Sequence, residues 1–88
     1  MRMFFRHPVV DFATWKVAYD SFDAERPGFG VTAHACYQAA DDPDDVTGWH
    51  DFETLEAAQV FDGSVRLREV MEGAGVAGAP DIWFTIPA

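Results

Sequence analysis

The chain has 88 residues, 49% of them hydrophobic and 15% aromatic, and a formal net charge of −9 at pH 7. This length and composition favour one hydrophobic core over a disordered segment, so we expect a single domain over residues 1–88. The acidic balance argues against nucleic acids and anionic membranes as partners, because both require a basic face. Cys36 is the only cysteine and the N-terminus has no long apolar run, which together predict a cytoplasmic protein without disulfides.

The first predicted elements are a strand and an aromatic helix. Residues 1–6, MRMFFR, alternate loosely and predict a strand that Pro8 closes. Asp11 has the chemistry of a helix cap, because its carboxylate can accept hydrogen bonds from the free backbone amides of the first turn. Pro27-Gly28 ends the helical segment. Five side chains recur at steps of three or four and share one face of this helix: Phe12, Trp15, Ala18, Tyr19 and Phe22.

A hairpin is predicted in the middle of the chain. Residues 31–39 and 46–52 have the composition of strands, and residues 41–45, DDPDD, that of the turn between them. With a four-residue loop at 41–44, the strands align so that His34 lies opposite Asp51. The same alignment pairs Cys36 with Trp49, Tyr37 with Gly48 and, on the other side of the sheet, Ala35 with His50.

A second helix and a closing strand are predicted in the remaining third. Thr54 can cap the helix, Asp62-Gly63 interrupts it, and Ser64 can cap its continuation. Residues 82–86, IWFTI, predict the closing strand after the glycines that end the helix. The side chains expected to face the core are Leu55, Ala58 and Phe61 before the interruption, and Leu67, Val70, Met71 and Ala74 after it.

The element order β-α-β-β-α-β predicts a fold of the α+β class. Two strand–helix–strand crossovers around a central hairpin give the ferredoxin-like plan, a four-stranded antiparallel sheet with both helices on one face. The strands carry apolar side chains in both directions, for example at the adjacent residues Trp83 and Phe84. We therefore expect a homodimer, in which a second copy covers the free face of the sheet.

Three stretches of the sequence resemble a known group of proteins. They are HPVVDFATWKVAYDSF, GVTAHACYQAADDPDDVTGWHDFETLEAAQVF and LREVMEGAGVAGAPDIWF. The group is the dimeric α+β barrel superfamily, especially its small cyclase-like and antibiotic-biosynthesis-monooxygenase-like proteins. The resemblance is carried by Asp11 with Trp15-Lys16, the Asp42-Pro43 hairpin, Ala58 with Phe61, and the approach to the last strand.

The resemblance implies a homodimer whose two sheets face each other in a dimeric α+β barrel, with a pocket between sheet and helices in each subunit. It also implies a range of chemistries: cofactor-free oxygenation, cyclisation of aromatic polyketides and haem breakdown, beside members without known activity. The matching motifs are structural, so no catalytic residue follows from the resemblance.

Two histidines are the candidate catalytic residues. His34 or His50 could act as a general base near neutral pH, and the predicted Asp51 partner would support His34 in that role. The alternative is that each is a buried histidine held by an ordinary hydrogen bond. The aromatic face of the first predicted helix is expected mainly to pack against the core and, in addition, to form part of a pocket wall. The candidate substrate-binding residues are Trp15, Tyr19, Tyr37, Trp49 and Trp83.

No metal or other cofactor is expected from the residue spacing. The three histidines, at positions 7, 34 and 50, lack close ligand spacing, and the acidic run 41–45 lacks the pattern of a calcium loop. Neither predicted helix contains a histidine that could hold haem, and Cys36 is more typical of packing than of a nucleophile.

Two hypotheses for the function remain open. In the first, the protein is a small cofactor-independent enzyme, a cyclase or monooxygenase, acting on an aromatic or polyketide-like molecule. In the second, it is a non-catalytic dimeric module that binds a small hydrophobic ligand or none. A cavity lined by converging polar groups favours the enzyme, whereas a space filled by Trp15, Tyr19 and Phe61 favours the module.

Overall fold

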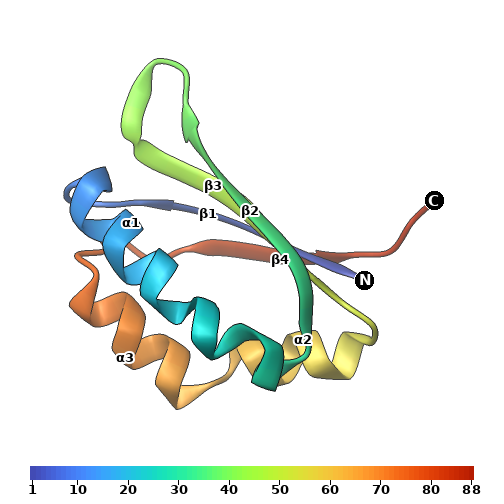
Figure 1. Ribbon diagram of the computed structural model, residues 1–88. Helices are drawn as coiled ribbons and strands as arrows, with labels where there is room; N and C mark the ends of the chain where they lie inside the picture. The colour runs from blue at the N-terminus through green and yellow to red at the C-terminus, as the bar shows by residue number, and fades with distance from the viewer.

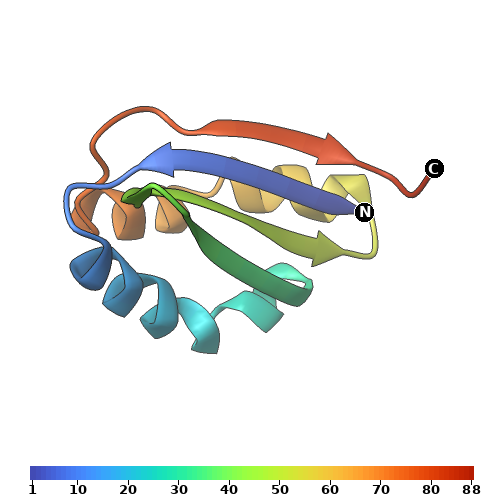
Figure 2. The same ribbon diagram turned by 90° about the horizontal axis from the view of Figure 1, so that it is seen from above.

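Four strands form one antiparallel sheet in the order β2-β3-β1-β4 (Figures 1 and 2). The computed structural model describes residues 1–88. This arrangement confirms the predicted α+β class and the ferredoxin-like plan. In chain order the elements are β1 (Arg2–Pro8), α1 (Phe12–Ser21), the 3-10 turns η1 (Phe22–Ala24) and η2 (Arg26–Phe29), β2 (Val31–Ala39), β3 (Asp42–Phe52), α2 (Leu55–Asp62), α3 (Val65–Gly73) and β4 (Asp81–Thr85).

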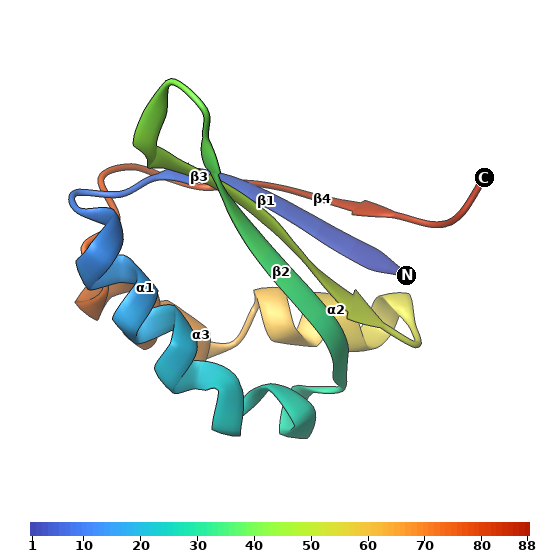
Figure 3. The ribbon, with the colours of Figure 1, turned by 45° about the horizontal axis from the view of Figure 1, so that its top comes forward.

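The helices all lie on one face of the sheet, and no element covers the other face (Figure 3). Helices α1 and α3 lie side by side across the sheet, and α2 continues beyond them toward the end of β3 (Figures 1 and 3). The face under the helices is called here the helical face, and the opposite one the open face.

Side-chain caps begin the three α-helices as the sequence predicts. Asp11 Oδ2 accepts from the amide of Thr14 at 3.0 Å, and the Thr54 hydroxyl accepts from the amide of Ala57 at 3.1 Å. Ser64 caps α3 after the break at Asp62-Gly63, so the interruption of the second helix is confirmed. Each cap satisfies one backbone donor that the helix itself leaves free.

The core is built on the alternation of β1, where Met3, Phe5 and His7 are buried on the helical face. Helix α2 adds Ala58 and Phe61, but Leu55 is 43% exposed, so its predicted burial is wrong. Leu55 is the first residue of the helix and precedes the turn that packs on the sheet. In α3 the predicted inward residues before Ala74 are only partly buried: Leu67, Val70 and Met71.

The hairpin differs from its predicted form. The turn consists of residues 40 and 41, and β3 begins at Asp42, so most of the acidic run lies in the strand. Pro43 is tolerated there because β1 ends at the level of Asp45, which leaves that end of β3 with one neighbouring strand. The shorter turn and an irregularity after Gln38 shift the register by one residue. The predicted pairs are therefore wrong: His34 faces His50, Ala35 faces Trp49, Cys36 faces Gly48 and Tyr37 faces Thr47.

The open face carries a row of apolar side chains across the sheet. Phe4 pairs with Trp49 on one side and with Trp83 on the other, and its ring stacks on that of Trp83 at 5.6 Å. Two bidentate ion pairs border the row, Arg2 with Asp51 and Arg6 with Asp45. An aromatic strip between ion pairs is thus left uncovered in the single chain.

Candidate active site

A cavity of about 60 Å³ lies between the helical face and the helices α1 and α3. Its floor on the sheet is formed by Met3, Phe5, His7 and His50. The ring of Phe5 lies over Gly48. A Cβ at residue 48 would lie 2.5 Å from this ring, so only glycine leaves room for it. The walls come from Trp15, Ala18 and Tyr19 of α1 and from Leu67, Val70 and Met71 of α3.

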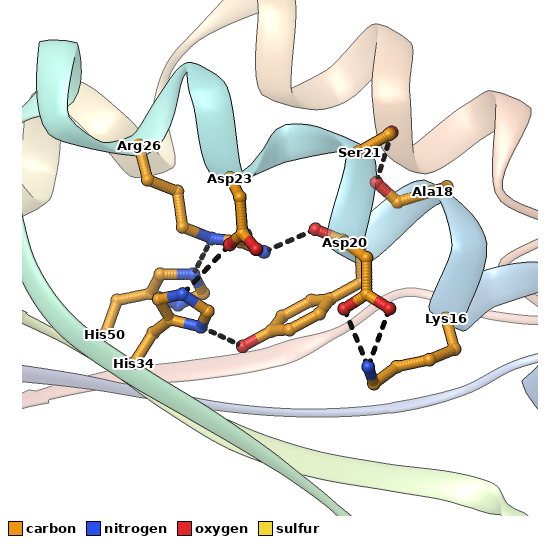
Figure 4. A network of polar contacts seen from close by, with 9 residues as sticks. Lys16, Ala18, Asp20, Ser21, Asp23, Arg26, His34 and His50 are labelled. Carbon is orange, nitrogen blue, oxygen red and sulfur yellow. Dashed lines mark hydrogen bonds and ion pairs between the residues drawn. The ribbon is translucent and has the colours of Figure 1, made fainter.

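Three polar side chains from three elements form a hydrogen-bonded chain beside this cavity (Figure 4). The Tyr19 hydroxyl, from α1, lies 2.6 Å from Nδ1 of His34 on β2. Nε2 of the same imidazole lies 3.1 Å from Oδ1 of Asp23 in η1. With the proton on Nε2, His34 donates to the carboxylate and accepts from the tyrosine. This Asp23–His34–Tyr19 chain, called here the relay, links a half-exposed carboxylate to Tyr19, a residue of the cavity wall.

Arg26 contacts two members of the relay, Tyr19 and Asp23 (Figure 4). It is only 3% exposed, and its Nε donates to Nε2 of His50 at 3.1 Å. Nη2 donates to the carbonyl of Tyr19 at 2.8 Å, Nη1 donates to Asp23, and the guanidinium lies 4.1 Å from the centre of the Tyr19 ring. Since η1 and η2 turn the chain back toward the sheet, one buried cation contacts α1, η1 and β3 at once.

His50, which lines the cavity, has a ring nitrogen without a hydrogen-bond partner. Because Nε2 accepts from Arg26, the proton of the neutral ring is on Nδ1, and Nδ1 is buried without a partner. Burial, followed by the charge of Arg26, lowers the pKa of His50 to about 3, so the ring is neutral near pH 7. Its ring stacks on that of His34 with centres 5.5 Å apart.

The relay is arranged for a neutral base and a protonated tyrosine. Burial, followed by the charge of Arg26, lowers the pKa of His34 below its usual value, which keeps the imidazole uncharged and able to accept a proton. Burial raises the pKa of Tyr19, so its hydroxyl keeps its proton and donates it to His34. A proton taken up at the tyrosine oxygen could thus pass to His34, where Asp23 would stabilise the imidazolium.

The structure brings together only part of the candidate set. Trp15, Tyr19 and His50 line the cavity, and His34 stacks on His50 on the helical face. The carboxylate beside His34 is Asp23, so the predicted partner Asp51 is wrong, and Asp51 instead pairs with Arg2. The remaining candidates, Tyr37, Trp49 and Trp83, lie on the open face and cannot line a cavity under the helices.

Asp23 and Arg26, two residues that organise the site, do not stand out in the sequence. Both fall in the stretch where the sequence predicts the end of a helix. Their spacing of three residues is the one available signal, since oppositely charged side chains at that distance can pair on a helical turn. Nothing in the pattern around Arg26 indicates that its guanidinium is buried.

Other chemistry-bearing groups do not form a second centre. No three histidine, cysteine, aspartate or glutamate side chains are grouped so that they could hold a metal ion. Cys36 is a free thiol whose pKa is raised mainly by burial, which disfavours the reactive thiolate. None of the helices has the length and apolar character needed to cross a membrane.

No protein-family model matches the sequence, and no curated protein matches it. Solved structures do match. A candidate antibiotic biosynthesis monooxygenase from Bordetella bronchiseptica superposes with a TM-score of 0.84 at 17% identity, over 99% of this chain and 95% of that one. The monooxygenase ActVA-Orf6 of Streptomyces coelicolor, in complex with nanaomycin D, gives 0.69 at 20% identity, over 99% and 86%.

A third match is SnoaB of Streptomyces nogalater, described as a cofactor-independent oxygenase. It superposes with a TM-score of 0.69 at 10% identity, over 99% of this chain and 93% of that one. At such identities the likeness concerns the backbone, and it covers nearly the whole chain. The protein therefore has the fold of the antibiotic biosynthesis monooxygenase-like proteins.

Proposed function

We propose that this protein is a small cofactor-independent enzyme, of the cyclase or monooxygenase type, that deprotonates an aromatic or polyketide-like molecule. The observation that carries the proposal is the relay, an Asp23–His34–Tyr19 chain that ends at the wall of an apolar cavity. Phenols and enols lose a proton readily, and both cyclisation and oxygenation can begin with that loss. The likeness in fold to SnoaB and ActVA-Orf6 supports this class of reaction.

Each polar side chain around the cavity has a separate role in the proposed reaction. Tyr19 accepts the substrate proton as it passes its own to His34, and Asp23 stabilises the charge that His34 acquires. The Nδ1–H group of His50 donates to the oxygen on which negative charge develops. Arg26 contributes a buried positive charge nearby, which further favours the anion because the site is shielded from water.

In the oxygenase form of the reaction, molecular oxygen is the second reactant. The substrate anion gives an electron pair to dioxygen as a carbon–oxygen bond forms at the ring carbon opposite the phenol oxygen. The proton held by His34 returns to the peroxide. Loss of the hydrogen on that carbon with cleavage of the oxygen–oxygen bond then releases one water. One phenol and one dioxygen thus give one quinone and one water.

The volume of the cavity requires the walls to move when a substrate binds. About 60 Å³ is well below the roughly 300 Å³ or more of typical ligand sites. Helix α3 is the wall suited to such a movement, because it has no fully buried residue and contributes the flexible side chain of Met71.

Replacing His34 by Gln or Tyr19 by Phe is expected to lower kcat/KM by about a hundredfold or more, since each removes one member of the proton path. The assay uses anthrone and 1-naphthol, two molecules with an acidic proton and a free ring position, and follows oxygen uptake together with quinone absorbance. Tyr37→Phe is the matched control, because Tyr37 lies on the same strand as His34 but on the open face. It is expected to stay within about twofold of the unchanged protein.

Retained turnover in both relay variants would show that the relay is not the base. Binding of these molecules without any oxygen uptake or cyclised product would instead support the non-catalytic module.

We further propose that two chains pair through their open faces, giving a homodimeric barrel. Phe4, Trp49 and Trp83 form a continuous apolar row there, and Trp83 is 46% exposed in the single chain. Each large apolar side chain that becomes fully buried contributes about 1.5–3 kcal/mol. A two-fold contact buries the same side chain in both copies of the chain. The acidic surplus does not oppose the contact, because Asp45 and Asp51 are neutralised by arginines at its border.

Sedimentation at micromolar concentration is expected to give twice the chain mass of 9.8 kDa. Trp83→Glu should convert the protein to the monomer, because it places a charge within the apolar row. Val17→Glu is the matched control: Val17 is 72% exposed on α1, away from the open face, and the variant should remain a dimer. A monomer in the unchanged protein contradicts the barrel.

A further inference from the structure

The hydrogen bond between Tyr19 and His34 is also suited to the transfer of an electron. The hydroxyl oxygen and Nδ1 lie 2.6 Å apart, and the imidazole accepts because its own proton is on the nitrogen that faces Asp23. A phenol that loses an electron becomes a strong acid, so its oxidation is easiest where a base takes the proton in the same step. Such a base prevents a positive charge from remaining on the ring, which is costly in apolar surroundings.

The charges around this pair decide where the proton stays. Nε2 of His34 lies 3.1 Å from Oδ1 of Asp23, and the carboxylate stabilises the imidazole once it is protonated. Arg26 acts in the opposite direction, because its guanidinium lies 4.1 Å from the centre of the Tyr19 ring. The same guanidinium is ion-paired with Asp23, which reduces this opposing effect. Loss of one electron from Tyr19 thus leaves an uncharged radical beside an imidazolium that has a carboxylate partner.

The other oxidisable side chains near the cavity and on the sheet lack such a base. Trp15 stacks on Tyr19 with ring centres 4.9 Å apart and lines the cavity, so it can pass an electron from Tyr19 to a molecule bound there. The indole proton of Trp15 has no acceptor on His7, which it contacts at 5.4 Å, since both ring nitrogens of His7 are unpartnered. Tyr37, the only other tyrosine, is 55% exposed on the open face, away from the histidines. Oxidation is therefore expected to end on Tyr19.

We propose that Tyr19 is a redox-active tyrosine that reduces organic peroxyl radicals, the class formed when dioxygen adds to a carbon radical. One electron passes from Tyr19 to the peroxyl group, which becomes a peroxide anion, and the hydroxyl proton passes to His34. The peroxide anion takes its own proton from water. An ascorbate-type reductant in solution then supplies one electron to the tyrosyl radical, and the proton on His34 returns to the tyrosine oxygen. This activity goes beyond the proposed function, because it moves an electron and needs no acidic substrate.

The test follows the tyrosyl radical after pulse radiolysis, which supplies the trichloromethylperoxyl radical as the probe. The two proteins compared both carry Tyr37→Phe, so that Tyr19 is the only tyrosine. The tyrosyl absorption is expected to grow about tenfold or more slowly in His34→Gln, whose amide can accept the hydrogen bond but not the proton. In the reciprocal background, Tyr19→Phe, the signal of Tyr37 should not respond to His34→Gln.

A measurement on the Tyr37→Phe protein covers the case in which His34→Gln does not fold. Electron paramagnetic resonance of the frozen radical should show magnetic coupling to one exchangeable proton, which is the proton that Nδ1 of His34 has received. Equal rates with His34 and with Gln, a radical confined to tryptophan, or a tyrosyl radical without this coupling overturns the inference. Since no substrate is turned over, the radical can form when the relay variants show that the proposed reaction is wrong. It can also be absent while that reaction stands.

Discussion

Lowering the pH from 7.5 to 4.5 is expected to reduce the free energy of unfolding by about 2.5–3 kcal/mol through His50 alone. In the unfolded chain this histidine takes up a proton near its ordinary pKa of 6.5, whereas in the folded protein the pKa is about 3. Between these values the unfolded state binds more protons, so acid favours unfolding. The stability is therefore fully present above pH 6.5 and is lost progressively as the pH falls toward 3.

The groups around His50 explain the direction of the effect. Arg26 donates to its Nε2, His34 stacks on it, and the rings of Phe5, Tyr19 and Phe61 cover it. The nearest cation and a second imidazole oppose protonation, and the carboxylate of the neighbouring Asp51 favours it only weakly, as the last of the four influences on the pKa. His7 adds to the loss in the same pH range, because burial lowers its pKa too.

Urea unfolding at intervals between pH 7.5 and 4.5 measures how the free energy of unfolding changes with pH. His50→Gln is the matched control, since the amide oxygen can still accept from Arg26 but does not titrate. Its loss of stability over the same range should be smaller by about 2.5 kcal/mol. Parallel curves for the two proteins would show that His50 is protonated as easily in the folded state as in the unfolded one.

Gly48→Ala is expected to destabilise the fold by about 3 kcal/mol, a large share of the roughly 5–10 kcal/mol of a domain this size. A Cβ at this position would lie 2.5 Å from the carbonyl oxygen of Ala35 and 2.5 Å from two ring carbons of Phe5. The ring lines the cavity and would have to shift, and the backbone oxygen belongs to the neighbouring strand. The same substitution should therefore weaken ligand binding as well as stability.

Gly73→Ala provides the comparison, because nothing lies within 4 Å of the Cβ and the residue ends α3. It should leave stability unchanged or raise it by about 0.5–1 kcal/mol. Thermal and urea unfolding of the two variants give the measurement. Adding Phe5→Leu to Gly48→Ala should recover only part of the loss, since the contact with Ala35 remains. An unchanged midpoint for Gly48→Ala would contradict the close packing of Phe5 on the sheet.

Features that depend on local sequence were predictable. Asp11, Thr54 and Ser64 cap helices where the sequence places them, because a cap needs only a side chain three residues from an amide. The aromatic face of α1 was equally visible, since 3.6-residue periodicity fixes which residues share a side. Trp15 and Tyr19 accordingly line the cavity.

The geometry of the site depends on features that local patterns do not encode. A turn shorter than the expected one moved every pair across the hairpin, and His34 thereby met His50 instead of Asp51. Burial of Arg26 depends on how two 3-10 turns fold back onto β3, a contact between segments 24 residues apart. The histidines were thus identified by residue type, whereas their partners required the three-dimensional structure.

The alternation along β3 has a consequence for engineering. Trp49 and His50 are neighbours in sequence, yet one belongs to the open face and the other to the cavity. If chains pair through the open face as proposed, a library confined to Phe4, Trp49 and Trp83 would vary that association without changing the residues that line the cavity. A one-residue slip in the pairing of β3 with β1 would turn Trp49 toward the helices and His50 toward the open face. Adjacent residues of β3 can therefore be varied separately, one for the open face and the next for the cavity.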